Sequence, residues 1–475
     1  MFSVQTYTER RNALKKAVGS GLILIMGNEE APMNYHDNTY RFRQDSNFLY
    51  FFGISHAGLA GIIDVDSGEE IIFGHDFTID DIIWVGPQAT LAEQARMVGV
   101  YRTEEPSKLP ERLKKSSKVH FTPPYRFDNM IRMSEWLGIQ TAQLKEKASV
   151  ELVKAIVALR SIKTDEEIVQ MEHAVNITRE MHIIAMQLTQ AGKKEYEIVA
   201  AIHAKALEGG GELSYPIIFT VNGQTLHNHY HGKTMTDGRL VINDSGAENA
   251  MFYAGDITRT IPVSKRFTEK QKEIYNLVLK METESIAALR PNIQYREIHI
   301  SANRIMLEGM KGLGFLNGDV TEMLAEGVQG LFMPHGLGHA IGLDVHDMED
   351  LGEKYVGYRD GLERSTQLGL KSLRLAKELE AGNVLTVEPG IYFIPELIDK
   401  WKAENKFTNF VNYAKLDAYR DFGGVRIEDN CLVTETGSKT LGNPIPKTVD
   451  EVEALRGKIV SPLAVSSQAM AIYVI

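Results

Sequence analysis

The chain has 475 residues, of which 43% are hydrophobic and 24% are charged, and its net charge is −11. This composition is typical of a globular protein with a sizeable core, and without a long lysine or arginine run the chain has no surface suited to nucleic-acid phosphates. Cys431 is the single cysteine, which excludes intramolecular disulfides and cysteine-based zinc sites. A reducing compartment is favoured, so we expect a cytoplasmic protein.

Two apolar segments resemble targeting signals, and their sequences argue against that function. Residues 17–26 follow Lys15-Lys16 as in a short signal peptide, but acidic residues replace the cleavage site, so we predict a buried strand at residues 22–26. Residues 459–475 are interrupted by Pro462 and are shorter than the roughly 20 residues that span a bilayer. We expect them to form a packed or frayed tail rather than a membrane anchor.

Residues 1–155 alternate short apolar runs with polar helical stretches, which predicts an α/β domain. The turn signal Asp66-Ser67-Gly68 separates predicted strands at residues 59–65 and 70–73, and a further strand is predicted at residues 119–121. The domain has no GxGxxG, GxxxxGK or GxSxG motif, which argues against nucleotide binding and a serine nucleophile. The glycine-rich stretch at residues 312–318 has the wrong spacing for a nucleotide site and is predicted to be a turn.

The chain divides near residue 160, and residues 156–475 form the second predicted domain. Helices are predicted after the capping box at residues 164–167, at residues 195–207, and after the capping box at residues 268–271. Strands are predicted at residues 215–221, 239–244, 384–388 and 424–428. Helices outside and strands inside indicate an α+β catalytic domain. The first helix has an apolar stripe formed by Ala174, Ile177, Met181, Ile184 and Leu188.

Three histidines occur within twelve residues, at His335, His339 and His346, among small and apolar neighbours. A solvated face would carry lysines and glutamates instead, so this stretch predicts a lined cleft where chemistry takes place. The alternative is a histidine-rich surface loop, or core histidines that bond to backbone. We would prefer that alternative for any one of these histidines alone.

Four carboxylates occur in or at the ends of apolar strands, where an ionised acid is costly unless a cation compensates it. Taken singly, each could instead be a strand-end residue exposed to water. Oxygen-rich ligation with one imidazole favours manganese or magnesium, although zinc and cobalt also fit. Two ions roughly 3.5 to 4 Å apart would use all four acids and would generate hydroxide at neutral pH, which indicates hydrolysis. The acids are Asp244, Asp256, Glu388 and Glu428.

These acids and His339 lie in motifs that resemble the five metal-ligand motifs of the pita-bread metallopeptidases, the group that contains methionine aminopeptidase, prolidase and aminopeptidase P. The resemblance implies a pita-bread fold for the second domain. Residues 41–50, Arg-Phe-Arg-Gln-Asp-Ser-Asn-Phe-Leu-Tyr, resemble the signature of the aminopeptidase P N-terminal domain. The five motifs are Asp-Ser-Gly-Ala-Glu at 244–248, Gly-Asp-Ile-Thr-Arg-Thr at 255–260, His-Gly-Leu-Gly-His at 335–339, Val-Glu-Pro-Gly-Ile-Tyr at 387–392 and Gly-Val-Arg-Ile-Glu-Asp at 424–429.

The resemblance implies a role for each ligand. Asp256 and Glu428 would bridge two metals, Asp244 would chelate one, and His339 with Glu388 would hold the other. Glu388 would also be the general base for the bridging water. From Asp244 to Asp256 is twelve residues where many relatives have eleven, so a bulge or longer turn must absorb one residue.

Further site residues follow from the same resemblance. His335 and His346 match histidines that contact the substrate. Arg426 lies two residues before Glu428 on the same strand face and can orient acidic ligands, as Tyr392 can. The histidine that helps proton transfer falls within residues 226–231, where ungapped counting selects His227 and the His-Tyr pair selects His229. Both remain candidates.

Three functions are compatible with these motifs. The first is an aminopeptidase that hydrolyses the N-terminal Xaa-Pro bond of peptides with two divalent metal ions, for which Mn²⁺ is expected. The second is a prolidase restricted to Xaa-Pro dipeptides, and only the N-terminal signature separates the two. The third, a metal-free peptide-binding protein on the same fold, is disfavoured because all five ligands are present. The resemblance also implies a homo-oligomer, a dimer or a tetramer.

Overall fold

The computed structural model describes residues 1–456, which form two compact units. Unit 1 contains Met1–Ile162 and a returning segment, Met348–Val356, and unit 2 begins at Lys163 and contains the other described residues. The predicted tail at residues 459–475 lies outside the described residues. Among the helices over residues 1–456, none has the length and apolar character needed to cross a membrane.

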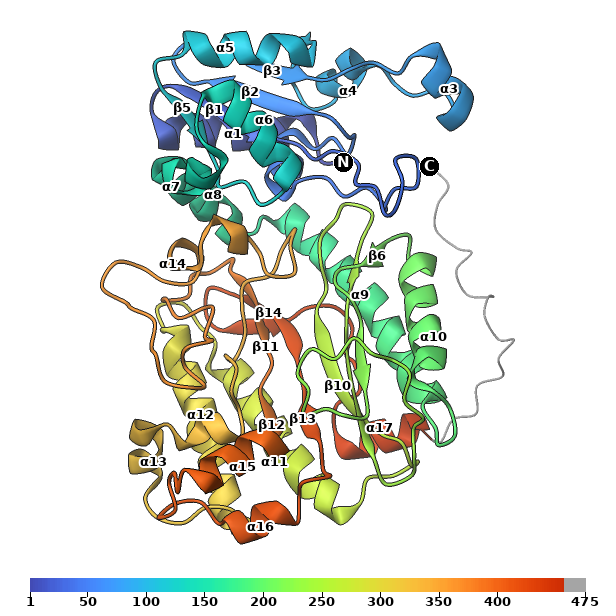
Figure 1. The fold of residues 1–475 in the computed structure, drawn as a ribbon, viewed down its shortest axis with the longest axis vertical. Helices are drawn as coiled ribbons and strands as arrows, with labels where there is room; N and C mark the ends of the chain where they lie inside the picture. Colours follow the sequence, from blue (N-terminus) through green and yellow to red (C-terminus); the bar gives the residue numbers. More distant parts are fainter. Residues whose placement is uncertain (457–475) are drawn as a thin grey trace. The chain divides into compact units, whose positions relative to one another are not determined.

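Unit 1 is built on one five-stranded sheet with the order β4-β3-β2-β1-β5 (Figure 1). Its central strands β1, β2 and β3 pair antiparallel, and the outer strands β5 and β4 run parallel to β1 and β3. The strands are β1 Leu22–Met26, β2 Ala60–Asp64, β3 Glu70–Phe73, β4 Thr103–Glu104 and β5 Val119–Phe121. The helices are α1 Val4–Val18, α2 Ser46–Phe52, α3 Ile79–Val85, α4 Leu91–Arg96, α5 Leu109–Lys115, α6 Phe127–Leu137, α7 Leu144–Lys147, α8 Val150–Ser161 and α14 Glu353–Val356.

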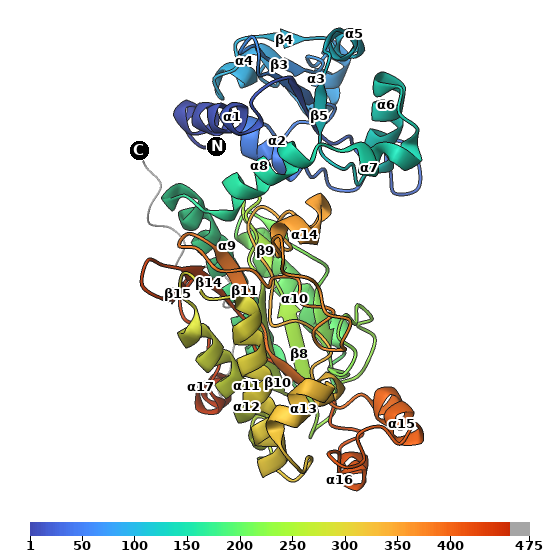
Figure 2. The same ribbon diagram turned by 90° about the vertical axis from the view of Figure 1, so that its left-hand side faces the viewer.

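Unit 2 has helices on the outside of several short sheets (Figure 1). Helix α9 packs against β8, β9 and β10 and is itself covered by α10, while α11 packs against β11, β12 and β13 and is covered by α12 (Figure 2). The helices are α9 Asp165–Leu188, α10 Glu195–Glu208, α11 Glu269–Ala288, α12 Tyr295–Gly312, α13 Val320–Glu326, α15 Pro395–Ala403, α16 Tyr413–Asp417 and α17 Val449–Arg456.

The strands of unit 2 form two three-stranded sheets, β10-β8-β7 and β11-β14-β15, and two strand pairs, β12-β13 and β6-β9. An isolated bridge between Thr258 and Glu428 connects β10 to the segment between β13 and β14. The strands are β6 Glu212–Leu213, β7 Ile218–Thr220, β8 Leu240–Ser245, β9 Ala247–Glu248, β10 Ile257–Pro262, β11 Val384–Val387, β12 Gly390–Tyr392, β13 Gly424–Arg426, β14 Asp429–Val433 and β15 Ser438–Thr440.

Local signals place most elements where the sequence predicts them. The predicted capping boxes of α9 and α11 are present. The side chains of Thr164 and Thr268 each accept the backbone N–H of the residue three positions later, and the side chain of that residue accepts the backbone N–H of the threonine. The buried face of α9 differs from the predicted stripe, because Ile184 and Leu188 are only half-buried and the buried face near the C-terminal end includes His182, Ala185 and Met186. The glycine-rich stretch after α12 is a turn, as predicted, with positive φ at residues 314 and 318.

Two predicted strands of unit 2 are shorter than the sequence indicates by more than one residue. Residues 215–221 contain strand only over Ile218–Thr220. The predicted strand at 424–428 ends at Arg426, because the chain changes partners there: β13 pairs with β12, while β14 pairs with β11. Glu428 lies at this change of partners, where it pairs with β10 instead.

Candidate metal centre

The first two predicted ligands lie in one strand and directly before its antiparallel neighbour. Asp244 lies in β8 opposite Thr258 of β10, and Asp256 lies two residues before Thr258. Residues two apart in extended chain point to the same face, so the two aspartates face the same side of the sheet. The β8–β10 register is regular, and the twelve-residue step from Asp244 to Asp256 includes β9 and a turn in which Phe252 has a φ of 66°.

The other three predicted ligands come from segments that run beside these strands. The segment that carries His339 runs alongside β11. The His339 carbonyl accepts the Thr386 N–H at 2.9 Å, and the Leu337 carbonyl accepts the Glu388 N–H at 2.8 Å. The Glu428 N–H donates to the Thr258 carbonyl at 3.0 Å. Strand pairing therefore brings residues from four distant parts of the chain to one place.

The side chains of the five predicted ligands form one cluster. Asp256, His339 and Glu428 each offer a ligand atom, and these atoms lie within 4.8 Å of one another. His339 Nε2 lies 3.3 Å from Asp256 Oδ2 and 3.8 Å from Glu388 Oε1. The Tyr215 hydroxyl lies 2.7 Å from Asp244 Oδ1 and 2.5 Å from Asp256 Oδ1, so it joins the two aspartates.

Burial makes this cluster electrostatically costly. It raises the pKa of Glu388 to about 7 and raises the pKa of Glu428 well above its usual value, with nearby acids adding to both effects. Burial also raises the pKa of Asp244, although Arg426 opposes it. For Asp256, burial is outweighed by the hydrogen bond and charge of His339, so the pKa is lowered. Four carboxyl groups and one imidazole in so small a space are a donor set that fits divalent cations.

A chain of hydrogen bonds lies beside the cluster. Arg426 Nη2 donates to Asp244 Oδ2 at 2.6 Å, and Nη1 donates to the Tyr392 hydroxyl at 2.8 Å. The His335 Nε2 lies 2.9 Å from the same hydroxyl, and its Nδ1 lies 2.7 Å from the Gly336 carbonyl. Burial lowers the pKa of His335 to about 3, so its imidazole is neutral, with Nδ1 as the donor and Nε2 as the acceptor. A hydrogen bond from His335 to a substrate must replace one of these two.

The remaining predicted histidines also face this region. The His346 ring lies against the His339 ring, with centroids 3.9 Å apart. His229 Nδ1 lies 3.4 Å from the Ile217 carbonyl. The pKa of His227 is lowered, mainly by burial and next by the positive charge of Arg426. All the predicted site residues except Tyr392 line one cavity of about 410 Å³: His227, His229, Asp244, Asp256, His335, His339, His346, Glu388, Arg426 and Glu428.

Sequence reasoning missed two residues that contact the acids. Tyr215 lies at the start of a predicted strand, and nothing in its neighbourhood indicates that its hydroxyl reaches Asp244 and Asp256. Thr258 donates its hydroxyl to Glu428 Oε2 at 2.7 Å. Its position two residues after Asp256, on the same strand face, is a signal that could have identified it.

Comparison with known proteins identifies the family. The model of metallopeptidase family M24 matches residues 169–435, and that of the aminopeptidase P N-terminal domain matches residues 7–121. The chain belongs to metallopeptidase family M24. The Pseudomonas aeruginosa aminopeptidase PepP structure is 28% identical to this M24 chain, with a TM-score of 0.80 over 96% of this chain and 98% of that one. The predicted pita-bread fold and α/β N-terminal domain are therefore confirmed.

Similar M24 relatives have different names. Xaa-Pro dipeptidase from Mus musculus is 34% identical over 461 residues, which cover 94% of this chain and 90% of that protein. A probable Xaa-Pro aminopeptidase from Aspergillus niger is 31% identical over 465 residues, which cover 94% of this chain and 96% of that protein. Both relatives extend over nearly the whole chain, so sequence identity alone does not separate the two activities.

Proposed function

We propose that this M24 metallopeptidase is a dinuclear aminopeptidase that hydrolyses the first peptide bond of chains with proline at the second position. One observation supports the proposal that the site binds two metal ions. Asp256 directs its two carboxylate oxygens to opposite partners, Oδ1 to the Tyr215 hydroxyl that also contacts Asp244, and Oδ2 to His339. A carboxylate with this arrangement is suited to bridge two cations.

The proposed ligand roles follow this division. Asp244 would chelate one ion, His339 and Glu388 would hold the other, and Asp256 and Glu428 would contact both. When bound, the two ions supply Lewis acidity that polarises the scissile carbonyl and lowers the pKa of the attacking water. Manganese is the expected ion because the donors are mainly carboxylate oxygens.

The chain's own residues would then position the substrate and move protons. Glu388, which lines the cavity beside His339, would accept a proton from the attacking water. Arg426 would keep Asp244 ionised and oriented through its 2.6 Å contact. His227 and His229 both line the cavity, so both remain candidates for proton transfer.

Substrate choice rests on the chemistry of the Xaa-Pro bond. This bond is a tertiary amide without an N–H, so a site that grips that hydrogen rejects it, whereas water attack needs only a polarised carbonyl. The buried acids can receive the free α-amino group, which limits cleavage to the first bond. His335 and His346 line the same cavity and would surround the proline ring.

A prolidase restricted to Xaa-Pro dipeptides is the second candidate, because the mouse Xaa-Pro dipeptidase is 34% identical to this chain. The match of residues 7–121 to the aminopeptidase P N-terminal domain does not separate the two, because the mouse protein aligns with 94% of this chain. We prefer the aminopeptidase because the Pseudomonas aeruginosa aminopeptidase structure covers 96% of this chain with a TM-score of 0.80. A metal-free peptide-binding protein remains the third and is disfavoured by the donor set.

A peptide-length series tests the proposal. We expect Mn²⁺-stimulated cleavage of Xaa-Pro-Yaa peptides, little or no cleavage when alanine replaces proline, and loss of activity on N-acetylation. Glu388→Gln is the inactive control. Cleavage of Xaa-Pro dipeptides with none of longer peptides would favour the prolidase, and equal rates on proline and alanine peptides would refute the specificity. Peptide binding without any turnover in Mn²⁺-loaded protein would favour the third candidate.

We further propose that the chain self-associates into a dimer or tetramer in the cytoplasm. Helix α3 of unit 1 supports self-association, because it leaves four large apolar side chains exposed by 58% to 86%. Exposed apolar patches mark interaction sites. Light scattering of the purified protein would test this, since a monomer at micromolar concentration would contradict it. The four side chains are Ile79, Ile83, Trp84 and Val85.

A further inference from the structure

Two neighbouring dipeptides, Thr258-Arg259 of β10 and Glu428-Asp429, lie side by side through the bridge between Thr258 and Glu428. In extended chain, successive side chains point to opposite faces. The Thr258 hydroxyl donates to the Glu428 carboxylate, while on the other face the Arg259 guanidinium donates to the Asp429 carboxylate. Glu428 lines the cavity, whereas Arg259 and Asp429 do not. A charged pair therefore lies directly behind a predicted metal ligand.

Arg259 uses every donor that a guanidinium has. Its side chain is 0% exposed, and its five N–H groups have five acceptors from three segments of the chain. Nη1 donates to the Glu428 carbonyl at 2.7 Å and to the Thr258 carbonyl at 2.9 Å, and Nη2 donates to Asp429 Oδ1 at 2.7 Å. The last two donors reach the carbonyls of Ile445 at 3.2 Å and Pro446 at 3.0 Å.

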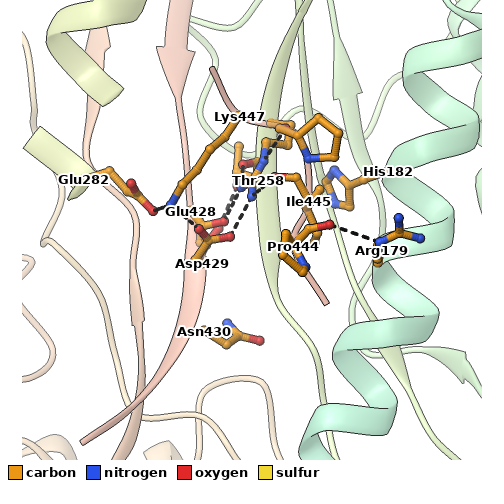
Figure 3. A network of polar contacts seen from close by, with 12 residues as sticks. Arg179, His182, Thr258, Glu282, Glu428, Asp429, Asn430, Pro444, Ile445 and Lys447 are labelled. Carbon is orange, nitrogen blue, oxygen red and sulfur yellow. Dashed lines mark hydrogen bonds and ion pairs between the residues drawn. The ribbon is translucent and has the colours of Figure 1, made fainter. Parts of the chain in front are cut away.

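Lys447 holds the Arg259–Asp429 pair from the side of Asp429. Lys447 Nζ donates to Asp429 Oδ2 at 2.7 Å and to Glu282 Oε1 of α11 at 2.7 Å. Figure 3 shows Lys447 between these two acids, with Glu428 adjacent to Asp429. Since Asp429 accepts from Arg259 with one oxygen and from Lys447 with the other, its carboxylate has one satisfied orientation. This fixes the guanidinium that contacts the Glu428 backbone.

We propose that Arg259 is a positioning residue for Glu428, and that Asp429 and Lys447 hold Arg259 in place. This inference rests on the proposed role of Glu428 as a metal ligand. The backbone of Glu428 is held at both polar atoms, since its N–H donates to the Thr258 carbonyl and its carbonyl accepts from Arg259. Glu428 lies where β13 ends and β14 has not begun, so regular strand pairing does not hold it. Groups behind a metal ligand commonly set its orientation.

The variant that tests this is Arg259→Lys, because lysine keeps the charge but cannot form the planar five-donor contact. We expect Mn²⁺ affinity, measured by calorimetry on metal-stripped protein, to fall by about 10- to 100-fold, as for other groups that orient metal ligands. The signal of bound Mn²⁺ in electron paramagnetic resonance should change with it. A folded Arg259→Lys protein that binds Mn²⁺ as the wild type does would overturn the inference.

Arg456→Lys is the matched control. Arg456 is also a buried arginine of unit 2, and it donates to the carbonyls of Met186 and Val263, away from the predicted ligands. Its replacement should lower the unfolding midpoint but leave Mn²⁺ affinity unchanged. Equal loss of affinity in both variants would mean that general destabilisation explains the effect, which overturns the positioning role.

A second variant keeps the inference testable if Arg259→Lys does not fold. Asp429→Asn retains the size of the side chain but removes the charge that pairs with Arg259 and Lys447, so it should also weaken Mn²⁺ binding, by a smaller factor. Wild-type affinity in Asp429→Asn would overturn the inference. If the wild-type protein itself binds no Mn²⁺, the proposed function fails, and this result is distinct from any difference between variants.

Discussion

Lys163 Nζ lies 2.9 Å from Asp347 Oδ2, and the two side chains are only 2% and 1% exposed. Asp347 directly follows His346, whose ring lies against His339. The Asp347 N–H also donates to the Ala340 carbonyl at 2.9 Å. The buried ion pair therefore fixes the end of the segment that carries two histidines of the cavity.

Removal of the cation from this pair should be strongly destabilising. Lys163→Met leaves Asp347 buried without its ammonium partner, and such changes cost about 3 to 5 kcal/mol. We expect the free energy of unfolding in denaturant to fall by this amount. The double variant Lys163→Met with Asp347→Leu should recover part of the loss, because it removes the buried charge as well. A single variant as stable as the wild type would contradict this account.

Replacement of Tyr392 and replacement of Arg426, which are hydrogen-bonded to each other, should have different effects on metal content. Tyr392→Phe removes the hydroxyl between Arg426 and His335 but touches no predicted ligand, so activity should fall by about 10- to 100-fold while metal content is retained. Arg426→Lys should lower both, since lysine cannot hold Asp244 and Tyr392 together. Steady-state kinetics and elemental analysis of both variants measure activity and metal content separately. Loss of metal in Tyr392→Phe would contradict the prediction that Tyr392 affects activity alone.

Ligand and base functions should also separate by mutation. His339→Ala removes a predicted ligand, so metal content and activity should both fall. Glu388→Gln removes the proposed base, so turnover should be lost chiefly through kcat, with partial retention of metal. Metal analysis of each purified variant beside its kcat provides the measurement. Full activity in either variant would exclude the proposed assignment of that residue.

Stability should depend on pH through His182 of α9. Burial lowers its pKa to about 3 in the folded protein, while the unfolded value is 6.5. Between pH 6.5 and pH 3, His182 is therefore protonated in the unfolded chain but neutral in the folded protein. The contribution of His182 to the free energy of unfolding is highest above pH 6.5 and falls as the pH decreases toward 3. This contributes a slope of up to about 1.4 kcal/mol per pH unit.

Denaturant unfolding at several pH values between 7 and 4 measures this slope. His182→Gln should have a lower stability at pH 7 and a shallower decline toward acid. His173→Gln is the control, since His173 is exposed on the same helix. An identical pH dependence of wild type and His182→Gln would show that other groups cause the acid sensitivity.

Local sequence signals predict a large part of this molecule. Strand β1, the β2–β3 hairpin and the capped helices α9 and α11 depend on residues a few positions apart, so their patterns are readable without the fold. The ten candidate site residues were also identifiable, because each lies in a short motif of specific residue types. The structure brings all ten to one cavity.

Other features arise only from contacts between distant parts of the chain. The strand predicted at 424–428 is interrupted because Glu428 pairs with Thr258, some 170 residues earlier. Residues 348–356 belong to unit 1 although both flanking segments belong to unit 2. Their own sequence carries no sign of this, because which unit buries a short segment depends on the surface it meets.

The short motifs predict which residues are candidate ligands, because carboxylates and imidazoles in these contexts suit divalent cations. How these side chains are held depends on the tertiary structure. Tyr215 joins Asp244 to Asp256, and Arg259 contacts the Glu428 backbone from behind. Hydrogen-bond geometry between side chains remote in sequence depends on strand register and on burial, and neither is encoded within a single motif.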